Sequence, residues 1–156
     1  MSGVPVEQID DLRYFGGILQ EVENAFSALD YQEALKGFEE SLIEEHAGHF
    51  SGRVDSSGSI WPPLAAYTIK KKGHDVPLFE TGEMKKSVLN PSHPDHVGAV
   101  SHRGLLFGTE DEKAIFHQFG TVKIPQRAFI GMSEGLVDKV TDGVANHAVE
   151  GLKFKA

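Results

Sequence analysis

Histidine is the residue type in this sequence with the clearest potential for chemistry, because its ring nitrogens bind metals and exchange protons near neutral pH. The 156-residue chain has eight histidines and no cysteine. Two pairs have i,i+3 spacing: His46 with His49, and His93 with His96. Asp95 or His102 is available as a third ligand for the second pair. A metal-dependent hydrolase that uses these histidine pairs is therefore one functional hypothesis.

The surroundings of the histidines favour a simpler interpretation. The first pair stands in the sequence EHAGH, where Glu45 precedes both histidines, unlike the H-E-x-x-H zinc motif. Both pairs lie in stretches rich in Gly, Ser or Pro, which are typical of solvated histidines. The sequence also has no G-x-S-x-G elbow, P-loop or G-x-G-x-x-G motif. We therefore predict no catalytic residue, no metal ligand and no cofactor, and expect that the protein is not an enzyme.

Acidic residues are concentrated at the start of the chain. Residues 1–50 contain eleven Asp and Glu against two basic residues, a net charge of −9, whereas the whole chain carries −8. Basic clusters are confined to lysines at 70–72 and 85–86. A DNA-binding accessory that uses these lysines is a further hypothesis, but a basic binding surface needs more clustered Lys and Arg than this. No run of about 18 apolar residues is present, so no membrane span is expected.

The first half of the chain is predicted to be mainly helical. Apolar residues at helical spacing run through 12–29 and again from Tyr31 to Leu42, and the second helix is expected to end near Gly48. Asp30 and Glu33 have the spacing of a capping box. Residues 50–60 read as a loop and as a candidate mobile segment. Short helices are expected through 65–72, before Gly73, and through 81–89.

The second half changes its periodicity. Residues 97–108 predict a β-hairpin, and Thr109 with Glu112 predicts a capping box for a helix that Gly120 closes. Residues 122–130 predict a strand interrupted by Pro125, and Ser133 is expected to cap a final helix. The fold class expected is α+β, with a small, mostly antiparallel sheet packed with several helices and a helical N-terminal part.

Four segments, in order, carry a resemblance to a known family: WPPL at 61–64 with Thr68 and lysines 70–72, LFETGEM at 78–84, AIFHQFG at 114–120 and IPQRAFIG at 124–131. Together they resemble the phage virion morphogenesis family, the tail-completion proteins of Mu-like and related tailed phages. The resemblance covers about residues 30–150. We divide the chain into an N-terminal helical segment 1–29, an α+β tail-completion-like domain 30–151 and a C-terminal tail 152–156.

The resemblance implies a structural virion protein at the neck or the head-proximal end of the tail, present in the host cytoplasm during assembly. Such a protein is expected to form a ring, a hexamer if it follows tail symmetry. It would contact the tail tube protein and the head connector, while genomic DNA passes through the channel without specific binding.

Candidate interface residues follow from this expectation. Trp61, the only tryptophan, either anchors the loop before it on the core or enters a pocket of a partner. Arg127 is a candidate for an ion pair with a carboxylate or for a contact with another subunit. Phe129, in the same segment, is also a candidate interface residue. Four glutamates are expected on the polar face of the second helix, where they line a channel or bind a basic partner ring: Glu39, Glu40, Glu44 and Glu45. His117 and Gln118 are expected to fix the corner between helix and strand.

Overall fold

The computed structural model describes residue 24 and residues 27–153, so the apolar stripe predicted over 12–29 lies almost entirely outside the described residues. Five helices and one two-stranded antiparallel sheet follow each other in this part of the chain: α2 (Gln32–Gly52), α3 (Ala66–Lys72), α4 (Glu83–Leu89), β1 (His96–Ser101), β2 (Gly104–Thr109), α5 (Ala114–Phe119) and α6 (Glu134–Lys153). The predicted α+β class with a small antiparallel sheet is confirmed.

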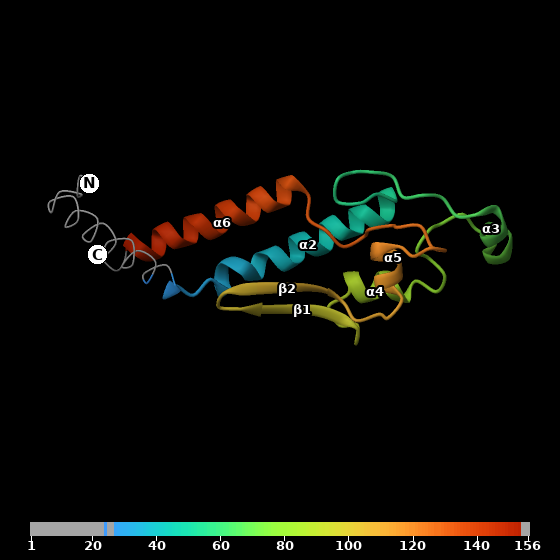
Figure 1. The fold of residues 1–156 in the computed structure, drawn as a ribbon. Coiled ribbons are helices and arrows are strands. Elements are labelled where there is room, and N and C mark those ends of the chain that lie inside the picture. The colour runs from blue at the N-terminus through green and yellow to red at the C-terminus, as the bar shows by residue number, and fades with distance from the viewer. Residues whose placement is uncertain (1–23, 25–26, 154–156) are drawn as a thin grey trace, which may run out of the picture.

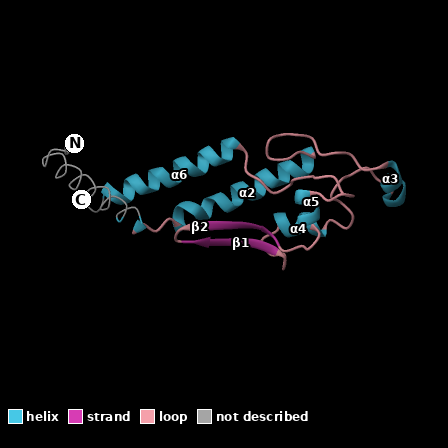
Figure 2. Ribbon diagram, viewed as in Figure 1, coloured by secondary structure: helices cyan, strands magenta, loops and turns pink. Residues whose placement is uncertain are grey.

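Helix α2 is the central element of the fold. It lies between α6, which runs antiparallel to it, and the β1–β2 hairpin, which lies along its other side (Figure 1). Close packing of α2 against α6 requires a glycine, because a Cβ atom at Gly143 would come within 2.6 Å of the Phe38 ring. Figure 2 shows α4 and α5 close together beside the C-terminal end of α2, while α3 lies apart from them at the right of the view.

The start of α2 differs from the predicted capping box. The Asp30 carboxylate accepts a hydrogen bond from the Gln32 backbone N–H at 2.9 Å. However, the N-cap position is occupied by Tyr31, whose side chain forms no capping hydrogen bond. Glu33 pairs instead with Lys36. Asp30 thus marks the start of the helix without forming the reciprocal box.

The end of α2 was predicted too early. The helix continues past Gly48 to Gly52 because His49 and Phe50 extend its buried face by one more turn. The predicted loop is correspondingly shorter. A bridge between Val54 and Ile60 closes it, so this segment has internal hydrogen-bonded structure.

The hydrophobic core lies beside the C-terminal end of α2, where α4, α5 and the long connections meet. Its buried members come from five different segments: Phe50, Trp61, Leu78, Met84, Val88, Ala114 and Phe129. Burial of several large apolar side chains is the main stabilising contribution at this end. The core thus fixes the relative positions of the segments that carry the family resemblance.

Several predicted elements are confirmed: the two short helices α3 and α4, the hairpin, and α6, where the Ser133 hydroxyl accepts a hydrogen bond from the Leu136 N–H at 3.3 Å. α5 begins only at Ala114, because Thr109 is the last residue of β2 and accepts a bond from Asp111 N–H. Gly120 ends α5 with φ 73° and ψ 173°, a conformation outside the left-handed helical region that was predicted.

The strand predicted over 122–130 is wrong. No ladder forms there, and the described sheet consists of β1 and β2 alone. No helix in the described residues is both long and apolar enough to cross a membrane.

Candidate functional site

Residues 124–131 cross the core as an extended segment whose backbone is bonded by side chains rather than by a neighbouring strand. The Gln118 Oε1 atom accepts the N–H groups of Phe129 and Ile130, both at 3.0 Å, and its Nε2 donates to the Ile130 carbonyl at 2.8 Å. His49 Nδ1 donates to the Phe129 carbonyl at 3.2 Å. Gln118 therefore fixes the corner after α5, as predicted.

Trp61 anchors the preceding loop on the core. Its side chain is buried, its Nε1–H donates to the Ala128 carbonyl at 2.8 Å, and its ring meets Phe50 edge-on with centroids 5.9 Å apart. Phe129 is fully buried. Within this subunit, Trp61 therefore anchors the loop on the core, the first of the two roles considered for it. A role for Trp61 or Phe129 at an interface stays a prediction, and in the single subunit Trp61 is 4% exposed and Phe129 is fully buried.

Arg127 joins two of the family-like segments to each other. Its side chain is only 4% exposed, and it donates from Nε to the Pro62 carbonyl at 2.6 Å and from Nη2 to the Pro63 carbonyl at 2.8 Å. Its backbone N–H donates to the His117 carbonyl at 2.8 Å. Burial lowers the pKa of the guanidinium from its ordinary value, but arginine stays charged in proteins. No carboxylate within residues 27–153 forms an ion pair with it, so the predicted carboxylate pairing is not observed inside this chain.

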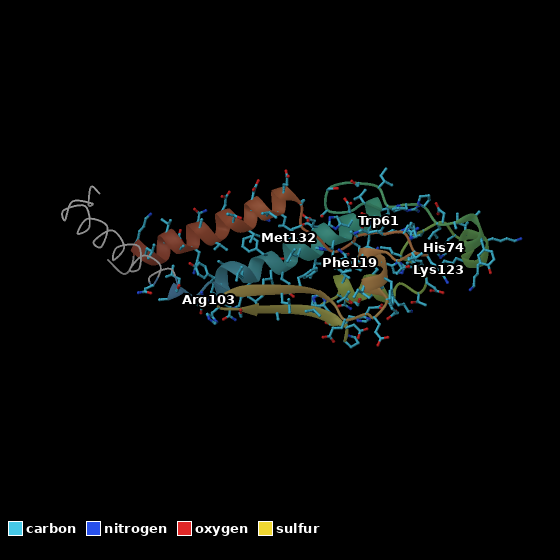
Figure 3. The ribbon with its side chains drawn as sticks, viewed as in Figure 1. Trp61, His74, Arg103, Phe119, Lys123 and Met132 are labelled. Carbon is cyan, nitrogen blue, oxygen red and sulfur yellow. The ribbon has the colours of Figure 1, made fainter. Side chains whose placement is uncertain are left out.

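A pocket of about 490 Å³ lies beside Arg127, and all four family-like segments contribute to its walls. We call it the Arg127 pocket. Apolar side chains form part of the wall: Pro63, Leu64, Leu78, Met84 and Ile124. Figure 3 shows Lys123, one of its cationic residues, on the side of the core that faces α3. The sequence indicated the four segments, but nothing in their composition indicated that they surround one cavity.

Cationic side chains outnumber acidic ones around the pocket. Its basic residues are Lys72, Lys113, Lys123 and Arg127, and its acidic residues are Glu80, Glu83 and Asp111. Glu83 pairs with Lys86 at 2.7 Å, and this hydrogen bond holds the pKa of the Glu83 carboxyl below its usual value. Lys86, which is not part of the pocket lining, neutralises the charge of Glu83. The net charge of the side chains around the pocket is therefore positive.

His117 lies in the same wall with an unused hydrogen-bonding atom. Its Nδ1 is buried and has no hydrogen-bond partner. Burial lowers the pKa of His117, and the neighbouring charges of Arg127 and Lys72 lower it further, against the opposing effect of Asp111. The imidazole is therefore held neutral in a positively charged environment.

The four candidate glutamates of α2 separate into two groups. Glu40 and Glu44 are exposed, as predicted for a polar face. Glu45 instead turns inward to the start of α6, where it accepts the Ser133 N–H and hydroxyl, both at 2.7 Å. A carboxylate at a helix N-terminus is stabilised by the helix dipole. The expectation of a solvated Glu45 is thus wrong, and its main contacts are within the subunit.

Glu39 also turns away from open solvent. Its Oε1 lies 3.7 Å from Nε2 of His96, whose side chain is 3% exposed. His96 Nδ1 donates to the Ser87 carbonyl at 2.9 Å, while Nε2 has no hydrogen-bond partner. Glu39 therefore faces the hairpin, and only Glu40 and Glu44 remain as a free acidic pair on the outer face of α2.

The expectation of solvated histidine pairs is wrong for His46, His49 and His96, whose side chains are buried and bonded to backbone groups. His46 is fully buried, bonds the Leu42 carbonyl through Nδ1 at 2.6 Å and accepts the Gly131 N–H through Nε2 at 3.2 Å. Both ring nitrogens are thereby occupied in the neutral form, and burial lowers the pKa of His46. Within the described residues, no three His, Cys, Asp or Glu side chains are grouped to hold a metal ion.

The lysine clusters are dispersed over different environments. Lys70 and Lys71 are exposed on α3, whereas Lys85 lies over the Phe50 ring at 6.0 Å and Lys86 pairs with Glu83. They do not form one continuous basic face that could follow a phosphate backbone.

In the described part of the chain, two surfaces combine several exposed apolar side chains, apart from single ones such as Ile60 and Tyr67. The first, the α5 patch, is formed by exposed side chains of α5 and the turn after it: Ile115, Phe116, Phe119 and Val122. The second is a groove of about 400 Å³ between α2, β2 and the segment before α6, which we call the α2–β2 groove; Leu106 and Met132 expose their side chains there. Several large apolar side chains exposed within one short segment or groove are typical of association sites.

A model of the phage virion morphogenesis family matches residues 10–148 of the chain. No curated protein and no solved structure matches it significantly. The match covers most of the sequence, so the chain belongs to the phage virion morphogenesis family. It is a structural protein of bacteriophage virions.

Proposed function

We propose that this protein is a tail-completion protein that forms a ring, a hexamer, at the head-proximal end of the tail and enables head–tail joining. The ring would contact the tail tube protein on one side and the head connector on the other, with DNA passing through its channel without specific binding. Assembly would take place in the host cytoplasm. Family membership supports the virion role.

The observation that supports ring formation most directly is the presence of two exposed apolar surfaces, the α5 patch and the α2–β2 groove. Phe119 is 71% exposed and Val122 is fully exposed, although both are large apolar residues. The α5 patch and the α2–β2 groove consist of different residues. Two different surfaces that fit each other form a head-to-tail contact, and such contacts close into a ring when the rotation allows.

A structural role without catalysis is part of the proposal. The hydrolase hypothesis needs several ligands around one metal ion, but both ring nitrogens of His46 are bonded to backbone groups. His96 has a free Nε2 atom, yet no three His, Cys, Asp or Glu side chains of the described residues are grouped to hold a metal ion. The described geometry therefore favours the structural role over metal-dependent hydrolysis.

The test uses purified protein and intact virions. Native mass spectrometry should give a closed oligomer for the wild-type chain, and Phe119→Asp should shift it to monomers because a charge placed in an apolar contact is costly to desolvate. Val149→Asp is the matched control, since Val149 is 49% exposed on α6, outside both apolar surfaces.

Electron microscopy of virions that carry a labelled copy of the protein gives the location. A ring of label at the junction of head and tail supports the proposal. Label on the capsid or at the distal end of the tail contradicts it, as does a single copy per particle.

A further inference from the structure

The Arg127 pocket has hydrogen-bonding capacity that the described chain does not use. Arg127 donates from Nε and Nη2, but no hydrogen bond forms from Nη1. His117 Nδ1 is buried without a partner. The side-chain amines of Lys113 and Lys123 form no ion pair within residues 27–153. The lining of the pocket thus combines the guanidinium of Arg127, which is buried, with the ammonium groups of Lys113 and Lys123, which are exposed residues.

The carboxylates that line the pocket in the described part of the chain do not satisfy these donors. Glu83 is bonded to Lys86 and lies 3.3 Å from His93. Asp111 accepts the backbone N–H of Lys113 at 2.9 Å, which fixes the turn before α5. Glu80 is exposed. The unused positive charge therefore remains available to a group from outside.

The shape and lining of the pocket select a carboxylate on a flexible stem. Its apolar wall residues suit the methylene groups of a glutamate, and arginine binds carboxylates through parallel N–H groups. Three acidic residues around the pocket disfavour a dense polyanion such as DNA.

A matching pair of carboxylates lies on the outer face of α2. Glu40 and Glu44 are exposed, and neither forms an ion pair or hydrogen bond within the described residues. Their i,i+4 spacing places both on one side of the helix, where like charges repel each other. A cationic partner would remove this repulsion, and residues 1–50 carry the excess negative charge of the chain.

We propose that the Arg127 pocket of one subunit binds the Glu40–Glu44 face of α2 in the next copy of this chain. This inference rests on the proposed ring, in which each subunit offers its acidic helix to one neighbour and its cationic pocket to the other. Electrostatic complementarity then sets the order of subunits, while the apolar surfaces supply contact area.

Charge reversal tests the contact. Lys113→Glu with Lys123→Glu should lower the yield of closed oligomers at a fixed concentration by about tenfold or more, and Glu40→Lys with Glu44→Lys should do the same. Combining all four changes should restore most of the yield, because the opposite charges face each other again. Lys70→Glu with Lys71→Glu, on the exposed side of α3 outside the pocket, is the control with an equal change of charge. Unchanged yield in both reversals, or a combination no better than either, would overturn the inference.

Cross-linking gives a second readout that does not depend on oligomer yield. Because the chain has no cysteine, Glu44→Cys with Lys123→Cys introduces two thiols on the two proposed faces. Oxidation of this variant, as purified protein or in virions, should give a ladder of covalent oligomers, while each single variant gives dimers at most. A ring without a ladder rejects this contact but not the tail-completion role. A ladder without label at the neck rejects that location and retains the contact.

Discussion

Gln118 replaces a neighbouring strand for part of the segment that follows α5. One amide side chain bonds two backbone N–H groups and one carbonyl, at Phe129 and Ile130. Trp61 and Arg127 likewise donate to backbone carbonyls, of Ala128 and of Pro62 and Pro63. The buried backbone is thus satisfied by individual side chains, which gives single residues a large influence on stability.

Gln118→Ala should therefore lower the free energy of unfolding by about 2–4 kcal/mol, since it leaves three partly buried backbone groups without partners. Gln126→Ala is the matched control. Gln126 is exposed and makes one bond, to the Gln118 carbonyl, so its loss should cost at most about 1 kcal/mol. Urea denaturation measures both, and equal losses would contradict the assigned role.

Stability should also depend on pH through His46. Burial lowers the pKa of this histidine below 6.5, so the unfolded chain takes up the proton more readily than the folded chain. The contribution is complete above the unfolded pKa and is lost as pH falls from about 6.5 toward the folded value, by at most about 1.4 kcal/mol per pH unit for one proton. His117, whose pKa is also lowered, acts in the same direction. Unfolding curves between pH 7.5 and 5 should have a shallower pH dependence in His46→Gln, and identical slopes would refute this.

At the scale of elements, long apolar stripes were the reliable signal. The stripe through Leu35, Phe38 and Leu42 predicts α2, and Ser133 predicts the start of α6, because periodicity and capping are local properties. The extension of α2 to Gly52 was missed because His49 and Phe50 are buried by residues distant in sequence.

The segment 124–131 shows why the irregular part of the fold could not be predicted from the sequence. Its apolar residues fit an interrupted strand, but its hydrogen-bond partners include side chains up to 85 positions away, as with His46 and Gly131. The same holds for the candidate site. The four family-like segments are visible in the sequence, whereas the pocket they enclose depends on Arg127 reaching the Pro62 and Pro63 carbonyls.

Glu45 connects α2 to the start of α6, and its removal should show this. Glu45→Ala should cost about 1–2 kcal/mol of stability, because the Ser133 N–H loses its acceptor and the N-terminus of α6 loses a nearby negative charge. The exposed neighbour offers the comparison: Glu44→Ala should change stability by no more than about 0.5 kcal/mol. Thermal unfolding measures both, and equal melting temperatures of the two variants would contradict this role of Glu45.

At the scale of the whole molecule, the exposed acidic pair of α2 and the cations of the Arg127 pocket lie on different parts of the subunit. α2 carries the exposed pair Glu40 and Glu44, and the cations of the Arg127 pocket lie at the other side of the core, toward α3 (Figures 1 and 3). This separation of charge favours the head-to-tail contact proposed above, in which the acidic pair of one subunit meets the cationic pocket of the next. In the proposed contact, Glu40 and Glu44 give a part of the excess negative charge of residues 1–50 a role beyond the exclusion of DNA binding.

Helix α3 lies at one extreme of the molecule and buries none of its seven residues (Figure 1). A helix of this length has little stability without tertiary contacts, so its amide protons should exchange with deuterium earliest among the five described helices, within the time that α2 remains protected. Hydrogen–deuterium exchange of the free subunit measures this order, and protection of α3 equal to that of α2 would contradict it. Slower exchange of α3 in assembled particles would then record, residue by residue, where a neighbour covers this helix.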